Sequence, residues 1–428
     1  MSNKRQELVV VGIGYVGLVT ACCLAKLGVH VTAIDNDKNK IAELKNLKVP
    51  IYEPGLDLII RESQDNLFFT DNLKSAMQNA TNIMIAVGTP MDENGDVDIS
   101  YLTCVVNEIA ECLLANPRNV NVIIKSTVPI GTNKIITDFF ADKNLSVNVI
   151  SNPEFLREGQ AIKDFMEPDR VVIGANSHNA AVDFATFYAK LNSKIIITTP
   201  ESAELGKYAA NGFLAAKIAY INQIAEVCDK SGANILEVAD IIGSDPRIGN
   251  QFLRPGPGFG GSCFPKDIRA LLAMSKKLAA NSSITEAIIK ANDLHQDFLA
   301  DKIKNIAGDF DNIAIFGLAF KAGTDDIRES PAISIIRKIE HYNIAVYDPE
   351  AMNNARALLG EKVRYAQDPY ELTEGADILI ILTEWGEFKN LDYIKIYQLM
   401  RKKVIIDFRL ILNRDEMEQI GFSYYDFG

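Results

Sequence analysis

The segment from Pro255 to Asp267 reads PGPGFGGSCFPKD and places one cysteine, Cys263, among four glycines and three prolines. Such a loop lets the backbone approach a ligand closely. We expect Cys263 to face a pocket, where Lys266 would favour its thiolate, the nucleophilic form. Asp267 could orient a water or assist proton transfer. The alternative is a small apolar residue that fills a loop, and we prefer such a packing role for Cys22, Cys23, Cys104, Cys112 and Cys228, which lie in helical pattern.

A second group of polar residues recurs at helical spacing. Glu204, Lys207 and Asn211 stand at positions i, i+3 and i+7 of an uninterrupted helical pattern. Lys207 and Asn211 are four residues apart and share one face, together with Ala210 and Leu214. Two interpretations stay open: the polar groups project into a pocket, or they form a solvated stripe.

A glycine fingerprint opens the chain. Gly12-Ile13-Gly14-Tyr15-Val16-Gly17 follows an apolar run and begins a helical stretch that ends near Leu27. Its glycines suit a tight turn, a close approach to a pyrophosphate and close packing of helix on strand. Asp35 stands at the end of the next apolar run, where a carboxylate accepts from the ribose diol and repels a 2′-phosphate. The pattern predicts NAD rather than NADP; the alternative is a glycine-rich turn of another α/β protein.

Alternating strands and helices must position these groups. Buried-type strands with helical pattern between them are predicted at 8–11, 29–34, 83–87, 120–125 and 147–150. This alternation is typical of a doubly wound parallel sheet. After a strand at 195–198, Thr199 and Pro200 suit the N-cap and first turn of a long helix that runs to about Lys230, and helical pattern continues to about Ile306.

The α/β alternation then returns. Strands are predicted at 313–316, 344–347, 378–382 and 404–407, with a helix at 330–341. The predicted fold class is therefore α/β, with two Rossmann-like doubly wound parallel-sheet domains joined by a helical domain that has a long central helix. The expected limits are 1–199, 200–306 and 307–428. NIMIAVGTP and DILIILTEW are loosely alike, which divergent duplication or the common α/β pattern would both produce.

Composition excludes several classes of protein. The 428 residues are 48% hydrophobic and 23% charged, and the net charge of -12 argues against nucleic acid or an anionic membrane as a partner. The polar start MSNKRQE argues against a signal peptide, and no run reaches the ~18 apolar residues of a membrane span. Six cysteines without a CxxC pair fit a reducing cytoplasm, and no metal-ligand spacing is present.

Together these motifs resemble one family. GIGYVG, VGTP (87–90), KSTVP (125–129), SNPEFLREG (151–159), ELGKYAANGF (204–213), FGGSCFPKD (259–267) and FGLAFKAGTDDIRESP (316–331) look like the UDP-glucose/GDP-mannose dehydrogenase family, in family order from residue 8 to about 410. The cysteine loop fits the UDP-glucose and GDP-mannose branches and lacks the GGHC form of N-acetylated-sugar branches. The resemblance is closest to the UDP-glucose branch.

The resemblance implies a role for each matching residue. Cys263 would be the nucleophile, Lys207 would stabilise the developing oxyanion, and Asn211 would hydrogen-bond near the reacting carbon. Asp267 would transfer protons through water. The remaining catalytic residues would be Thr127, which places a water, Glu158, which contacts that water and the nicotinamide, and Glu154, the acid/base of thioester breakdown.

The resemblance also implies two binding sets. NAD would be held by Gly12, Ile13, Gly14, Tyr15, Val16, Gly17, Asp35, Lys40, Thr89, Thr127, Glu158, Lys266 and Arg328. The nucleotide sugar would contact Glu154, Phe155, Leu156, Arg157, Glu158, Lys207, Asn211, Phe252, Leu253, Arg254, Pro255, Gly256, Gly260, Lys321 and Arg409. Arg247 would reach the UDP of a neighbouring subunit in a homodimer. Residues 1–199 would then bind NAD, 200–306 would dimerise, and 307–428 would bind the UDP-sugar.

The implied reaction is a four-electron oxidation of UDP-glucose to UDP-glucuronate through a cysteine thiohemiacetal and thioester. It needs one thiol, a cation near the oxyanion and carboxylates that manage protons. The four histidines, at 30, 178, 295 and 341, lie outside these motifs. The alternatives are oxidation of GDP-mannose and a non-catalytic nucleotide-sugar binding protein.

Overall fold

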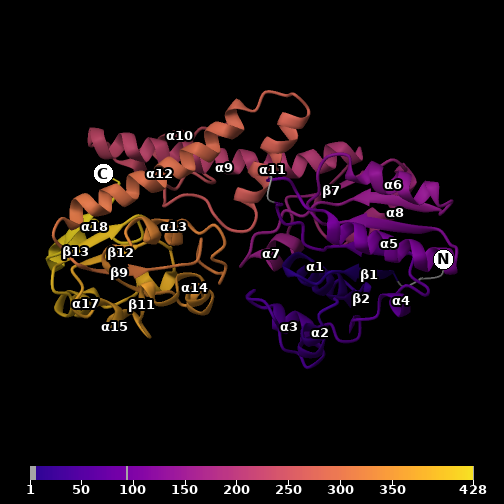
Figure 1. The fold of residues 1–428 in the computed structure, drawn as a ribbon, viewed down its shortest axis with the longest axis horizontal. Helices are drawn as coiled ribbons and strands as arrows, with labels where there is room; N and C mark the ends of the chain where they lie inside the picture. The colour runs from indigo at the N-terminus through magenta and orange to yellow at the C-terminus, as the bar shows by residue number, and fades with distance from the viewer. Residues whose placement is uncertain (1–5, 93–94, 428) are drawn as a thin grey trace. The chain divides into compact units, whose positions relative to one another are not determined.

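The computed structural model describes residues 6–92 and 95–427. Most of the polar start that argues against a signal peptide lies outside these ranges. The chain divides into two compact units, Met1–Ala210 and Asn211–Gly428, with the boundary inside helix α9 (Pro200–Ser231). Figure 1 labels many of the helices and strands of both units. No helix in the described part of the chain is long and apolar enough to cross a membrane.

The first unit is built on an eight-stranded sheet in the order β3-β2-β1-β4-β5-β6-β7-β8. Neighbouring strands are parallel, except that β6 and β7 are antiparallel. The strands are β1 (Glu7–Val11), β2 (His30–Ile34), β3 (Leu67–Thr70), β4 (Asn82–Ile85), β5 (Val120–Ile124), β6 (Val147–Ser151), β7 (Arg170–Ala175) and β8 (Lys194–Thr198). The helices are α1 (Tyr15–Lys26), α2 (Lys38–Lys45), α3 (Leu56–Glu62), α4 (Leu73–Ala76), α5 (Ser100–Ala115), α6 (Thr132–Asp142), α7 (Ala161–Met166) and α8 (His178–Ala185).

Both faces of this sheet are covered. Alternate residues of β1 enter different cores: Leu8 and Val10 pack in the cluster that contains α1, whereas Val9 and Val11 pack in the cluster that contains residues of α5. A strand buried on both faces reads as a continuous apolar run, which explains why ELVVV shows no alternation.

The second unit contains a six-stranded, fully parallel sheet in the order β11-β10-β9-β12-β13-β14. The strands are β9 (Asn312–Phe316), β10 (Asn343–Tyr347), β11 (Arg364–Tyr365), β12 (Ile378–Ile381), β13 (Val404–Asp407) and β14 (Ser423–Tyr425). The helices are α10 (Ile235–Gly243), α11 (Phe264–Lys277), α12 (Ser283–Ala307), α13 (Pro331–Lys338), α14 (Met352–Leu359), α15 (Pro369–Thr373), α16 (Gly386–Lys389), α17 (Tyr393–Leu399) and α18 (Arg414–Ile420).

Both sheets share the Rossmann order 3-2-1-4-5-6 over their first six strands, so the predicted fold class is confirmed. The long helix is also confirmed, and the Ser202 backbone N–H donates to Thr199 Oγ1 at 3.2 Å, as an N-cap requires. The helix predicted at 330–341 ends earlier, at Lys338, where the Ile339 N–H turns back to the Ile336 carbonyl. The domain limits 1–199, 200–306 and 307–428 stay a prediction.

Candidate active site

The glycine loop lies at the carboxyl end of β1 and is tied to the end of β2. The Gly12 N–H donates to the Ile34 carbonyl at 2.8 Å, and the Ile13 N–H donates to Asp35 Oδ2 at 3.1 Å. Lys40 Nζ forms an ion pair with the same Asp35 oxygen at 2.9 Å. The Asp35 carboxylate therefore fixes the loop and stands where a ribose would be read.

Each glycine of the fingerprint meets different surroundings. A Cβ at Gly17 would lie 1.9 Å from the Gly12 carbonyl oxygen, and one at Gly12 (φ +87°) would lie 2.8 Å from Val87 Cγ1. At Gly14, by contrast, no atom of the described chain lies within 4 Å of such a Cβ. Gly14 is also the N-cap of α1, and no described side chain caps it. Two glycines thus permit packing, and the third leaves an open helix N-terminus that fits the pyrophosphate of NAD.

The loops that follow β4 and β5 are joined by hydrogen bonds. Thr89 Oγ1 donates to the Thr127 carbonyl at 2.8 Å, and Ser126 Oγ donates to the Val87 carbonyl at 2.6 Å. Both loops leave the same edge of the sheet as the glycine loop, which is where ligands bind in open α/β sheets.

A buried ion pair joins the segment after β6 to α9. Lys207 Nζ lies 2.8 Å from Glu154 Oε1, and the two side chains are only 4% and 6% exposed. Burial alone would raise the pKa of Glu154, but the Lys207 ammonium and the Leu156 N–H hold that pKa below its usual value. The pocket interpretation of Lys207 is therefore correct, and the solvated stripe is excluded for this residue.

A second buried lysine supports this segment. Lys125 Nζ donates to Asn152 Oδ1 at 3.1 Å, and Tyr188 Oη donates to the same oxygen at 2.6 Å. Burial lowers the pKa of Lys125 to about 8, against the attraction of Glu154. Sequence reasoning missed both Lys125 and Asn152, although each directly follows an apolar strand.

Glu204 closes the other side of this region. Its carboxylate accepts from the Gly131 N–H at 2.7 Å and the Asn133 N–H at 2.8 Å, at the start of α6. Burial raises the pKa of Glu204 to about 7, although these backbone bonds oppose the shift. Glu204, Lys207 and Thr127 line a cavity of about 10 Å³, roughly the space of one water, together with Ile124, Ser126, Val128, Ser151 and Pro153.

The segment 154–158 is anchored beyond Glu154 as well. Arg170 lies over the Phe155 ring at 3.8 Å, and Arg157 forms an ion pair with Asp164 at 2.6 Å. The Gly159 N–H donates to Tyr15 Oη and to Glu53 Oε2, each at 2.8 Å, and Tyr15 donates to that same carboxylate. The buried Glu53 thus ties the glycine-loop helix to this segment; sequence reasoning missed it, because no motif surrounds it.

In the second unit, Cys263 is the N-cap of α11. Its carbonyl accepts from the Asp267 N–H at 2.8 Å, and its sulfur lies 3.5 Å from Ser262 Oγ. This position places the sulfur at the helix end whose dipole stabilises negative charge. Cys22, Cys23 and Cys228 are buried, as expected of packing residues, but Cys104 is exposed, so packing does not explain it.

The glycines before Cys263 permit close contact with the segment 320–331. A Cβ at Gly260 would lie 2.3 Å from the Glu329 carbonyl oxygen, and one at Gly261 (φ +84°) would lie 2.7 Å from the Phe320 ring. The Gly261 N–H also donates to the Arg328 carbonyl at 2.9 Å. The glycine-rich loop before Cys263 and the segment 320–331, which are distant in sequence, therefore pack directly against each other.

Asp267 is a buried carboxylate with two donors. Asn211 Nδ2 lies 2.6 Å from its Oδ2, and Lys266 Nζ lies 2.6 Å from its Oδ1. The structure thus brings together three predicted catalytic or binding residues beside the cysteine loop. The interaction shown for Lys266 is with Asp267.

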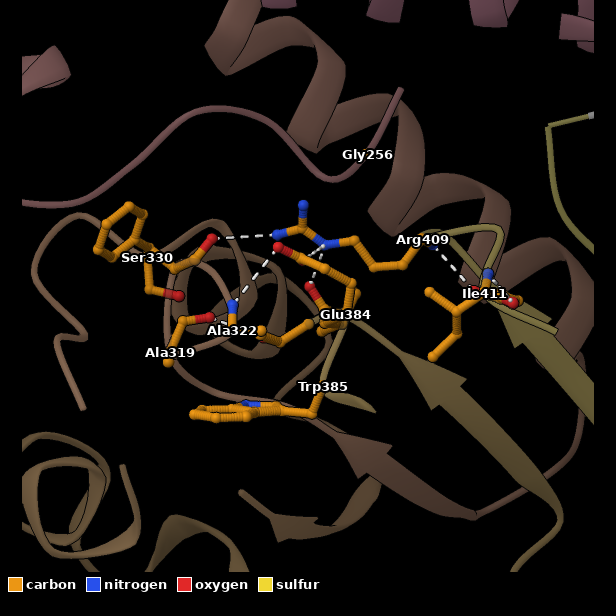
Figure 2. A network of polar contacts seen from close by, with 12 residues as sticks. Gly256, Ala319, Ala322, Ser330, Glu384, Trp385, Arg409 and Ile411 are labelled. Atoms are coloured by element: carbon orange, nitrogen blue, oxygen red, sulfur yellow. Dashed lines mark hydrogen bonds and ion pairs between the residues drawn. The ribbon is translucent and has the colours of Figure 1, made fainter. Parts of the chain in front are cut away.

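The segment 252–256 lies beside Arg409, which belongs to the C-terminal part of the chain, where the match to the family motifs is weakest. A Cβ at Gly256 would lie 3.0 Å from Arg409 Nη1. Arg409 donates to the Leu382 carbonyl at 2.8 Å and to the Phe320 carbonyl at 3.1 Å, and pairs with Glu384 at 3.1 Å (Figure 2). The Arg409 guanidinium is therefore fixed beside the backbone of Gly256, where no side chain intervenes.

The side-chain contacts shown for three other predicted residues are with near neighbours in sequence. Arg247 is 88% exposed and pairs with Asp245 of its own loop. Arg328 pairs with Asp326 at 2.8 Å, and Lys321 Nζ lies over the Phe320 ring at 5.5 Å. In the part of the chain that the structure describes, no group of three or more His, Cys, Asp or Glu could hold a metal ion.

The strand order and the glycine loop of the first unit are those of a dinucleotide-binding α/β protein. Family models match in order: the NAD binding domain of the UDP-glucose/GDP-mannose dehydrogenase family at residues 6–192, its central domain at 201–294 and its UDP binding domain at 314–414. The chain belongs to the UDP-glucose/GDP-mannose dehydrogenase family, which confirms the resemblance and NAD as the cofactor.

Particular relatives are similar over nearly their whole length. UDP-glucose 6-dehydrogenase TuaD of Bacillus subtilis (strain 168) is 43% identical over 99% of this chain and 93% of its own. UDP-glucose 6-dehydrogenase of Rickettsia conorii is 42% identical over 98% of each chain. A solved UDP-glucose dehydrogenase from Pyrobaculum islandicum has a TM-score of 0.92 and 34% identity, over 100% of this chain and 98% of that one.

Proposed function

We propose that this chain oxidises UDP-glucose to UDP-glucuronate with two NAD per sugar. The observation that carries the proposal is Cys263 at the N-terminus of α11, one turn before a buried Asp267 that Asn211 and Lys266 hold. A primary alcohol becomes an acid in two oxidations. A thiol is the group that keeps the aldehyde bound between them.

The first oxidation requires removal of a hydride and a proton. NAD, when bound, would supply the hydride acceptor, and the residues that would hold it are Gly12, Ile13, Gly14, Tyr15, Val16, Gly17, Asp35, Lys40, Thr89, Thr127, Glu158, Lys266 and Arg328. The hydroxyl proton leaves through a water positioned by Thr127, for which the cavity beside Lys207 has room. The Lys207 ammonium stabilises the alkoxide that develops.

The second oxidation takes place on the protein. The Cys263 thiolate adds to the aldehyde carbon, the oxygen takes up a proton, and a thiohemiacetal results. Loss of a second hydride and a proton gives a thioester. Water then adds to the thioester carbon, with Glu154 as acid/base, and the C–S bond breaks to release the acid and restore the thiol. Asp267, Asn211 and Glu158 would manage protons and hold the reacting carbon.

The sugar nucleotide would contact Glu154, Phe155, Leu156, Arg157, Glu158, Lys207, Asn211, Phe252, Leu253, Arg254, Pro255, Gly256, Gly260, Lys321 and Arg409.

We also propose a homodimer. Phe213, Tyr220 and Val227 recur every seven residues on α9 and are 69%, 56% and 55% exposed, as for an apolar face covered by a second subunit. Arg247, which is 88% exposed and pairs with Asp245 of its own loop, would reach the neighbouring UDP. The cysteine usage favours the cytoplasm.

A stoichiometric assay tests the function. Two NADH formed per UDP-glucose consumed supports the four-electron reaction, and one per sugar contradicts it.

Cys263→Ala should abolish acid formation and leave UDP binding within about twofold, since only the nucleophile is lost. Cys104→Ala, the same change at an exposed cysteine, is the matched control. Faster turnover of GDP-mannose would favour that substrate, and UDP-glucose binding without NADH would favour a binding protein.

A further inference from the structure

His295 is a buried histidine to which the reaction assigns no role. It lies on α12 and is 2% exposed. Its Nδ1 lies 2.7 Å from Glu226 Oε1, and its Nε2 lies 2.9 Å from the Gly256 carbonyl oxygen. A carboxylate oxygen and a carbonyl oxygen both accept hydrogen bonds, so the ring lies between two acceptors.

The peptide that His295 holds is fixed on its other sides as well. The Gly256 N–H donates to Asn222 Oδ1 at 3.0 Å. Its Cα faces Arg409, since a Cβ there would lie 3.0 Å from Nη1, and Figure 2 shows this segment passing beside the guanidinium. Further along the same loop, Asn292 bonds both the N–H and the carbonyl of Phe259, at 2.9 and 3.2 Å. Three bonds from α9 and α12 thus set the path of the chain toward Cys263.

We propose that His295 is a positioning residue for the sugar nucleotide: its bond to the Gly256 carbonyl holds the 252–256 segment in its binding conformation. The inference rests on the proposed assignment of 252–256 to the substrate. Replacing the ring removes its hydrogen bond to the Gly256 carbonyl, which is the contact between α12 and the 252–256 segment.

Glu226 is the charged side chain shown to bond the ring. On α9, the neighbouring Asp229 pairs with Lys302, and Lys230 Nζ lies over the Phe298 ring at 5.9 Å. From the C-terminal segment, Phe427 stacks on the histidine with ring centroids 5.9 Å apart, and the Asp426 carboxylate pairs with Arg414. The Asp426 carbonyl accepts from Lys302.

The test compares His295→Gln with the wild type. The KM for UDP-glucose and the Kd for UDP by calorimetry should both be about tenfold higher in the variant, the effect of one lost hydrogen bond. kcat and the KM for NAD should change less than about twofold. His341→Gln, at an exposed histidine of the same unit, should match the wild type throughout.

Glu226→Gln provides a second variant at a partly exposed position. In this variant His295 keeps its bond to the Gly256 carbonyl, so the KM for UDP-glucose should stay within about threefold of the wild type. An unchanged KM for UDP-glucose in His295→Gln, or a fall in kcat with unchanged KM, would overturn the proposal. A wild type that oxidises no UDP-glucose would instead contradict the proposed function, whereas normal wild-type turnover with unaltered variants contradicts only the role of His295.

Discussion

Replacing Lys207 by methionine tests whether the Glu154–Lys207 ion pair is structural as well as catalytic. The side chains are 4% and 6% exposed and 2.8 Å apart, so the change leaves a buried carboxylate without its nearest cation. Removing one partner of a buried pair typically costs about 3–5 kcal/mol of unfolding free energy. We expect the low end, about 3 kcal/mol, because Lys125 also attracts Glu154 and remains.

The two proteins should respond to pH in opposite directions. In the wild type, Lys207 holds the pKa of Glu154 below its usual value, so the contribution to stability is present above the usual carboxyl pKa and is lost as pH falls through the lowered one. In Lys207→Met, burial dominates and raises the pKa of Glu154. Stability is then greatest below the usual carboxyl pKa and falls as pH rises.

A double-mutant cycle provides the measurement. Denaturant unfolding of the wild type, Lys207→Met, Glu154→Gln and the double variant gives the coupling energy. The double variant contains no uncompensated charge from the pair, so it should regain most of the lost stability, with a coupling of about 2 kcal/mol or more, yet remain inactive. Additivity within about 0.5 kcal/mol would refute the reasoning.

Two further predictions concern the first unit. Gly17→Ala should destabilise it by about 3 kcal/mol or more, because the new Cβ would lie 1.9 Å from a backbone oxygen, whereas Gly14→Ala should leave stability within about 0.5 kcal/mol and weaken NAD binding at least tenfold. Melting curves and NAD titrations separate these effects, and equal behaviour of the two variants would contradict them. Burial raises the pKa of Glu204 to about 7, so the wild type should lose stability relative to Glu204→Gln as pH rises from about 5 to 8. A difference that is constant with pH would contradict this.

The sequence could predict the elements whose pattern is local. Strand β13 has the predicted limits, and β1, β5, β9 and β10 lie within one residue of theirs. Strands β3, β7, β11 and β14 were missed. Strand β7 pairs with β6 in antiparallel orientation at only two positions, although α7 lies between the two strands, so it departs from the parallel order that the alternation predicts. Strand β11 has only two residues, which is too short for a periodic signal.

The site shows the same division between local and distant information. Cys263, Asp267 and the glycine fingerprint stand out because their neighbours in sequence are unusual. Lys125 and Asn152 bond across 27 residues because β5 and β6 are adjacent, and His295 meets Gly256 across 39 residues because α12 packs on the loop. Neither pairing follows from spacing along one element. Each pairing nevertheless has a physical cause, because a buried ammonium or imidazole that lacks hydrogen-bond partners costs free energy of folding. The order of the strands decides which distant polar residue supplies them, so a polar residue at the end of a buried strand is worth examining even where no motif surrounds it.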